Sequence, residues 1–181
     1  SISSTTSSSG VAGNVNISTP DLLVANGAVV GSQTIGNGAG GNLTINAKRI
    51  QVSGNNIPAA TALSTASLVA GNAGHLIINT DNLIVNNSGA VTSSSIGRGN
   101  AGNITINAAE SIEVTGNLPQ AESPSQIRST LRTPSAFAQR FFNIPAIPQG
   151  KGGNININTP SLKIDDKASV TVANTGIGDS G

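Results

Sequence analysis

A Gly-Asn pair followed by alternating apolar and polar residues recurs along the chain and constrains its fold more than any other feature. The five copies of this anchor are Gly13-Asn14, Gly41-Asn42, Gly74-His75, Gly102-Asn103 and Gly153-Asn154. Their spacings are 28, 33, 28 and 51 residues, so a unit of about 28 residues carries one small and one large insertion. Repeats of this length are typical of stacked architectures, in which each unit buries its apolar face only against its neighbours.

Each copy alternates apolar and polar residues with a period of two, which is typical of strands with one buried face. The pairs expected to face inward in a first strand are Val15/Ile17, Leu43/Ile45, Leu76/Ile78, Ile104/Ile106 and Ile155/Ile157. A second strand supplies Leu22/Val24, Ile50/Val52, Leu83/Val85, Ile112/Val114 and Leu162/Ile164. A third, weaker strand is expected in the odd-numbered copies, at residues 28–30, 90–92 and 168–172.

Three strands per copy describe a coil, and stacked coils at the inter-strand spacing of about 4.8 Å would bury a continuous aliphatic column. Crossovers between parallel strands are right-handed in nearly all proteins. The sequence therefore predicts an all-β chain that forms a right-handed parallel β-helix of five coils, with a short helical insert. Corner glycines are expected to supply positive-φ turns, at Gly36, Gly38, Gly40, Gly41, Gly97, Gly99, Gly102, Gly150, Gly152 and Gly153.

Asparagine recurs at fixed phases of the repeat. Asn46, Asn79, Asn107 and Asn158 are expected to form one hydrogen-bonded ladder with Ser18 at its end. The triplets beginning at Asn16, Asn42, Asn86 and Asn103 also match the glycosylation acceptor. We favour the ladder because the repeat fixes these positions, and we expect His75 to serve as a polar corner residue in place of an anchor asparagine.

Composition excludes several classes of protein. Only 9% of the residues are charged and the net charge is +1, which removes the electrostatic drive toward nucleic acid. No cysteine is available for a disulfide or a thiolate site. No run of 18 apolar residues occurs, so we expect no membrane insertion.

The sequence predicts no catalytic, cofactor-binding or metal-binding residue. Two Gly-x-Gly-x-x-Gly matches, at residues 36–41 and 97–102, precede a strand where a dinucleotide site needs a helix. The acidic residues are scattered, and Glu110 and Glu113 are interpreted as surface residues. We therefore expect a non-enzymatic protein.

Residues 117–149 break the repeat and are predicted to form an insertion loop. Apolar residues at i and i+4 predict two short helices, at residues 125–131 and 133–141, the second with Thr133 as N-cap and Pro134 at its first position. One interpretation packs Ile127, Leu131, Phe137, Phe141 and Phe142 against the flank of the coils. The alternative is a binding site for an acidic glycan or a partner protein, formed by Arg128, Arg132, Phe137, Arg140, Phe141 and Phe142.

Residues 40–47 (Gly-Gly-Asn-Leu-Thr-Ile-Asn-Ala) and 99–108 resemble the repeat region of filamentous-haemagglutinin-type exoproteins of gram-negative bacteria. The resemblance covers nearly the whole chain apart from residues 117–149. It implies a long right-handed β-helix, export through a dedicated outer-membrane transporter in two-partner secretion, and a place outside the cell or on the bacterial surface. It also implies a role in adhesion, aggregation or biofilm formation.

Both ends of the chain match the phase of the repeat. Residues 1–10 are expected to be the last strand of a preceding coil, and residues 178–181 resemble residues 99–102. We therefore expect residues 1–181 to be a single segment of a longer β-helix. The predicted function is a structural or adhesive segment that self-associates into fibres, and the alternative is a carbohydrate-binding or carbohydrate-active β-helix.

Overall fold

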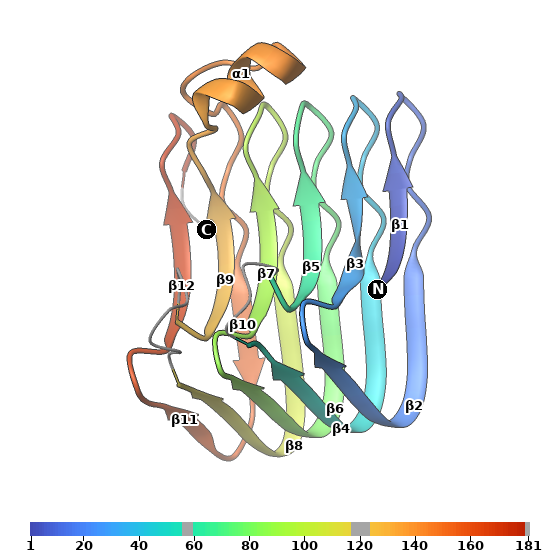
Figure 1. Ribbon diagram of the computed structural model, residues 1–181, viewed down its shortest axis with the longest axis vertical. Helices are drawn as coiled ribbons and strands as arrows, with labels where there is room; N and C mark the ends of the chain where they lie inside the picture. Colours follow the sequence, from blue (N-terminus) through green and yellow to red (C-terminus); the bar gives the residue numbers. More distant parts are fainter. Residues whose placement is uncertain (56–59, 117–123, 180–181) are drawn as a thin grey trace.

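The computed structural model describes residues 1–55, 60–116 and 124–179. Its strands form two sheets in which all pairs are parallel, and successive strands along the chain alternate between them from β1 to β9 (Figure 1). Sheet A consists of β1 (Ile2–Thr6), β3 (Val29–Thr34), β5 (Ala62–Ser67), β7 (Ala90–Ser95), β9 (Gln126–Leu131) and β12 (Ser169–Asn174). Sheet B consists of β2 (Val15–Ala25), β4 (Leu43–Ser53), β6 (Leu76–Asn86), β8 (Ile104–Thr115), β10 (Ile155–Asn158) and β11 (Leu162–Ile164).

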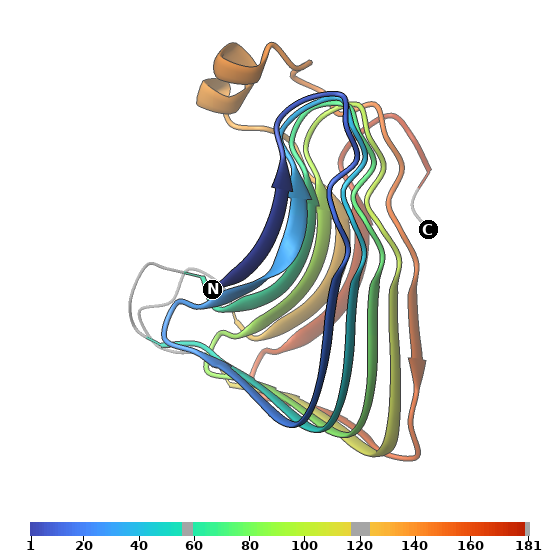
Figure 2. The same cartoon turned by 90° about the vertical axis from the view of Figure 1, so that its right-hand side faces the viewer.

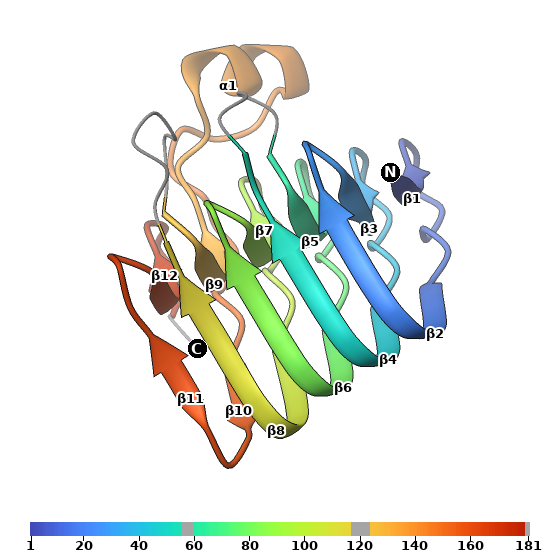
Figure 3. The ribbon, with the colours of Figure 1, turned by 60° about the horizontal axis from the view of Figure 1, so that its bottom comes forward.

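We call one passage through sheet B and then sheet A a coil, which gives five coils preceded by β1 (Figure 2). The first and second strands predicted for each copy are one continuous, bent strand in coils 1 to 4, and separate as β10 and β11 only in coil 5 (Figure 3). The predicted inward pairs of coils 2, 3 and 4 are all buried. Full burial of each Ile or Leu side chain stabilises the fold by about 1.5–3 kcal/mol.

The bend in the sheet B strands explains why odd and even copies differ. In odd coils a threonine at the bend donates its hydroxyl to the carbonyl two residues on, from Thr19 to Asp21, Thr80 to Asn82 and Thr159 to Ser161. Even coils carry Ala47 or Ala108 at this position. Thr80 also donates to the carbonyl of Lys48 in the preceding coil, so the alternation lets one hydroxyl serve two coils.

Sheet A contains a strand in every coil, so the third strand that is visible in the sequence of the odd copies is also present in the even ones. Two of its inward columns are hydroxyls, including Ser32, Thr65 and Ser93, and all are buried. Ser32 and Ser93 accept hydrogen bonds from the backbone N–H of Gly41 and Gly102. These hydroxyls bind the backbone of the following corner, and a search for apolar alternation overlooks them.

A second hydroxyl column closes the glycine corner, the segment between each sheet A strand and the next sheet B strand. Thr34 donates to the carbonyl of Gly38 at 2.6 Å, and Ser95 donates to that of Gly99 at 2.6 Å. Ser67 makes the same contact with Gly71. The side-chain hydroxyl therefore donates a hydrogen bond to a corner carbonyl that lies beyond the end of the paired strand.

The prediction that the corner glycines adopt positive φ is wrong. Positive φ among the described glycines occurs only at Gly27 and Gly116, neither of which lies in a glycine corner. The corner glycines instead permit close stacking: a Cβ on Gly99 would lie 1.9 Å from the carbonyl oxygen of Gly71 in the coil below. Positive φ is concentrated at the opposite corner, before sheet A, in the pairs Asn26-Gly27, Asn87-Ser88 and Asp166-Lys167.

Polar ladders run along the outside of the stack, and the predicted asparagine ladder is confirmed for Asn46, Asn79 and Asn107, with Ser18 and Asn158 in the same register column. Asn79 donates to the side chain of Asn46 at 2.8 Å, and Asn107 donates to that of Asn79 at 2.9 Å. A second ladder joins the anchors, because each side chain accepts the backbone N–H of the next anchor. His75 takes its place in this ladder as predicted, with Nδ1 accepting from the N–H of Asn103 at 3.1 Å.

The region predicted as one insertion, residues 117–149, contains a strand of the sheet. Residues 125–131 are not a helix: β9 pairs with β7 on one side and β12 on the other. The predicted pattern is equally compatible with a strand, since i and i+4 share a strand face as well as a helix face. Ile127 and Leu131 are accordingly buried inside the coil rather than against its flank.

The larger extra segment follows β9. Twenty-three residues separate β9 from β10, whereas eight separate β7 from β8. Gly150 stacks on the carbonyl of Gly99, which aligns residues 147–154 with the corner at 96–103. The insertion into the repeat is therefore residues 132–146, and it contains helix α1 (Ala136–Phe142).

Candidate functional site

The six predicted site residues fall into two groups that are adjacent along the chain. Arg128 lies on β9, and Arg132 follows that strand directly, its N–H donating to the carbonyl of Ser95 at 2.9 Å. The other four residues, Phe137, Arg140, Phe141 and Phe142, lie on α1. Figures 1 and 2 show α1 projecting beyond the ends of the sheet A strands.

Local contacts explain why the chain turns into a helix here. Ser135 is the N-cap, since its hydroxyl accepts the N–H of Ala138 at 3.2 Å; the predicted cap, Thr133, lies two residues earlier. Thr133 instead donates its hydroxyl to Thr175. Asn143 ends the helix with φ of 50°. This is the left-handed conformation, which glycine adopts most readily and asparagine next.

Two of the three aromatic side chains of α1, those of Phe137 and Phe141, are exposed, whereas that of Phe142 is half-buried. Phe137 and Phe141 are 71% and 69% exposed, so the prediction that they pack against the flank is wrong. Their rings stack with centroids 5.4 Å apart, and Phe142 meets Phe141 edge-on at 4.9 Å. A shallow depression of about 420 Å³ is lined by Ala136, Phe137, Arg140 and Phe141. Exposed, mutually ordered aromatic rings are typical of contact surfaces.

The outward face of β9 carries the second group. Arg128 is half-buried, and its Nε has no hydrogen-bond partner. Thr130, two residues on and on the same face, is 5% exposed, and its hydroxyl also has no partner. Burial, followed by the nearby charge of Arg132, lowers the pKa of Arg128. The search for helical spacing missed Thr130, which a period of two through residues 128, 130 and 132 would have identified.

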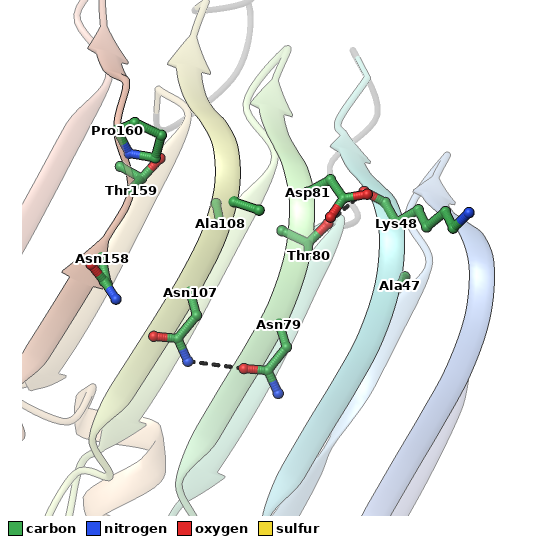
Figure 4. Close-up of a pocket in the computed structure, with 11 residues that line it drawn as sticks. Ala47, Lys48, Asn79, Thr80, Asp81, Asn107, Ala108, Asn158, Thr159 and Pro160 are labelled. Carbon is green, nitrogen blue, oxygen red and sulfur yellow. Dashed lines mark hydrogen bonds between the residues drawn. The ribbon is translucent and has the colours of Figure 1, made fainter.

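A second concave surface lies over the bend of sheet B, where the outer asparagine ladder passes between coils (Figure 4). It has a volume of about 800 Å³ and includes Asn79, Asn107, Lys48 and Asp81 in its lining. The amides of Asn79 and Asn107 bind each other. This surface therefore has a structural explanation in the stacking of the coils.

The acidic residues considered at the sequence level make structural contacts. Glu110 accepts from the side-chain amide of Asn82 at 2.7 Å, and Glu113 pairs with Lys163 at 2.9 Å. Glu113 raises the pKa of Lys163 through that hydrogen bond and its charge. Within residues 1–55, 60–116 and 124–179 no three His, Cys, Asp or Glu side chains gather as a metal site would require.

Comparison of the chain with protein-family models, with curated proteins and with solved structures finds no match. The class that the structure defines is a mostly β protein built from two parallel sheets. Among the described residues, no helix has the length and apolar character needed to cross a membrane.

Proposed function

We propose that the chain is a segment of a right-handed parallel β-helix with a non-enzymatic, structural and adhesive role. Strict alternation of parallel strands between two sheets over coils 1 to 4 supports this architecture, and the handedness follows the general preference of parallel crossovers. Each coil is paired in register with its neighbours. Such a stack is stiff, because each bend is pinned to the coils on either side.

The observation that carries the adhesive role is the exposed aromatic surface of α1 on this stiff support. Phe137 and Phe141 are ordered by stacking on each other and by the capped helix, although neither is buried. Keeping two large apolar rings in water is unfavourable unless a partner covers them. We therefore assign α1 as a contact surface for a glycan or a protein at the surface of another cell.

We further propose that the protein is secreted or displayed on the bacterial cell surface, after export by an outer-membrane transporter. The repeat resemblance is the basis for this, and a fold stabilised by stacked aliphatic columns and amide ladders without any cysteine is compatible with it. Self-association of such segments, side by side or end to end, would build fibres.

Electron microscopy of the purified chain tests the structural part of the proposal. We expect elongated rods that associate into filaments with an axial repeat of about 4.8 Å. Compact, non-fibrous particles at all protein concentrations would contradict the fibre assembly. The adhesive part is tested by coating beads with the intact chain or with a chain lacking residues 132–146, and comparing their attachment to bacterial or host cells.

The alternative function is that of a carbohydrate-binding or carbohydrate-active β-helix. The specific observation in its favour is Arg128, which forms no ion pair with another described residue and precedes the exposed aromatic helix by eight residues. Turnover of a polysaccharide by the purified chain would favour a carbohydrate-active protein, whereas binding without turnover would unite this alternative with the adhesive role.

A further inference from the structure

Helix α1 has an apolar face that the coils do not cover. Phe137 and Phe141 lie one helical turn apart, both are largely exposed, and their rings stack on each other. Ala136 and Arg140 are exposed on the same side of the helix and line the depression beside the two rings. Exposed apolar patches of this kind mark contact surfaces for proteins or for membranes.

The fold holds the two rings in this position. Ala138 is 8% exposed and Phe142, one turn further on, is half-buried, so this side of the helix faces the protein. Ile144, directly after the helix, is also buried. Because α1 is fixed through these residues, Phe137 and Phe141 cannot turn inward without releasing them, and their rings remain in water.

The insertion that carries α1 is positively charged. Residues 132–146 contain Arg132 and Arg140 and no acidic residue. Both arginines are exposed, and neither takes part in the ion pairs that the described residues form. An apolar helix face bordered by cationic side chains is complementary to a bilayer with anionic headgroups, because the rings enter its apolar part while the guanidinium group stays with the phosphates.

The chemistry of the depression favours a lipid over a saccharide. Of the four described residues that line it, Arg140 alone has a polar side chain, and the others are Ala136, Phe137 and Phe141. A sugar ring carries several hydroxyl groups, and leaving them without partners at a contact costs binding energy. A phospholipid requires only an apolar surface and a cation near its phosphate.

The size of the surface argues against a protein as its principal partner. A phenylalanine side chain contributes about 150–250 Å² of contact area, so Phe137 and Phe141 together contribute about 500 Å² at most. Each partner in a standard protein interface buries about 800 Å². A bilayer sets no such minimum, since it accepts single side chains at its surface.

We propose that α1 is an interfacial lipid anchor. Phe137 and Phe141 enter the boundary between headgroups and acyl chains of an anionic bilayer, and Arg140 binds the headgroup phosphates. The helix has seven residues, whereas a span requires about 20, so the contact is confined to one membrane surface. Because α1 projects beyond the ends of the sheet A strands, a flat bilayer can approach it (Figures 1 and 2). This inference goes beyond the proposed function, because the partner is a lipid bilayer rather than a glycan or a protein.

A tryptophan reporter tests whether α1 enters the bilayer. The chain contains no tryptophan, so a single introduced one reports only on its own surroundings. Phe137→Trp is titrated with vesicles of neutral phosphatidylcholine, or of phosphatidylcholine mixed equally with anionic phosphatidylglycerol. We expect a blue shift of the fluorescence with the anionic vesicles. The matched control is Leu23→Trp, because Leu23 is 67% exposed on sheet B, and its fluorescence should not shift.

Sedimentation of the intact chain with the same vesicles measures the contribution of each residue. Phe137→Ala and Phe141→Ala should each weaken binding about tenfold. Arg140→Gln should weaken binding to the anionic vesicles about fivefold. Lys48→Gln removes the same charge from an exposed position on sheet B and should leave binding unchanged. All three α1 side chains are exposed, so the melting temperature of each variant should match that of the unmodified chain.

Several outcomes overturn the lipid anchor. They are the absence of a blue shift for Phe137→Trp in excess anionic lipid, an equal shift for Leu23→Trp, equal binding of neutral and anionic vesicles, and full binding by a chain with both phenylalanines replaced by alanine. Attachment of coated beads to cells without any binding to vesicles would refute this inference alone. Binding to vesicles without attachment to cells would refute the proposed adhesive role alone.

Discussion

The hydroxyl that closes each glycine corner replaces a hydrogen bond that the sheet cannot provide. Ser95 is fully buried, and it donates to the carbonyl of Gly99 at 2.6 Å. Removing the donor leaves a buried carbonyl unsatisfied, so Ser95→Ala should lower the free energy of unfolding by about 1–3 kcal/mol. Urea denaturation measures this. Ser94→Ala, one residue away on the outward face, is the control and should change it by less than about 0.5 kcal/mol.

Close stacking of the coils depends on the absence of a side chain at the glycine corners. In Gly99→Ala the new Cβ would lie 1.9 Å from the carbonyl oxygen of Gly71, a backbone atom that is fixed by its own coil. The coils must separate locally, and we expect a loss of about 1–3 kcal/mol. At Gly10 the added Cβ would lie 3.7 Å from Ser8 Oγ. Gly10→Ala should therefore be neutral, and equal effects of both substitutions would refute the stacking explanation.

At the scale of the element, the helical insertion is an addition to a corner that is otherwise intact. Residues 147–154 align with residues 96–103, and Leu131 takes the place of Ser95 in register. A chain without residues 132–146 should therefore fold with the same circular dichroism spectrum in the strand region. Aggregation or unfolding of this chain would show that the insertion is needed for coil 4.

The same deletion gives a prediction about Leu131. Once residues 132–146 are removed, position 131 lies four residues before Gly150, as Ser95 lies before Gly99. In the shortened chain Leu131→Ser should lower the melting temperature less than in the full-length chain, because a restored corner hydrogen bond offsets part of the loss of the buried leucine. In the full-length chain it should lower the melting temperature, because the corner is interrupted and a buried leucine is lost. Scanning calorimetry of the four chains measures both effects.

Sheets A and B differ in their inward residues, and this difference explains which strands could be predicted from the sequence. Sheet B was predictable because its inward residues are aliphatic at alternate positions, as in Leu43, Ile45 and Ile78. The outer ladder was predictable because one residue type recurs at one phase. Strand β5 was not, since its inward Thr65 and Ser67 hydrogen-bond to other side chains and to the corner backbone rather than filling an apolar core.

The candidate site was harder to predict for a different reason. Its residue types, arginine and phenylalanine, were identified, but the spacing around Arg128 fits a strand and a helix equally well. Only strand pairing with both neighbours distinguishes the two. A period of two would have placed Thr130 on the same strand face as Arg128, but the burial of Thr130 cannot be predicted from a local pattern.

At the scale of the whole molecule, stability should vary along the stack because each coil contacts only its neighbours. Leu83 and Ile112 are buried in coils 3 and 4, whereas Leu162 and Ile164 of β11 in coil 5 are 46% and 44% exposed. We expect amide hydrogen exchange in β4, β6 and β8 to be about 100-fold slower than in β11. Exchange mass spectrometry at peptide resolution measures this gradient.

The gradient also bears on assembly. If segments stack end to end in filaments, the amides of β10 and β11 gain partners on the side that faces away from β8. Their exchange should then slow as protein concentration rises, while β6, which is already paired on both sides, should not change. Slowing confined to the outward faces would instead indicate side-by-side association. Exchange that is independent of concentration in every strand would contradict self-association of either kind.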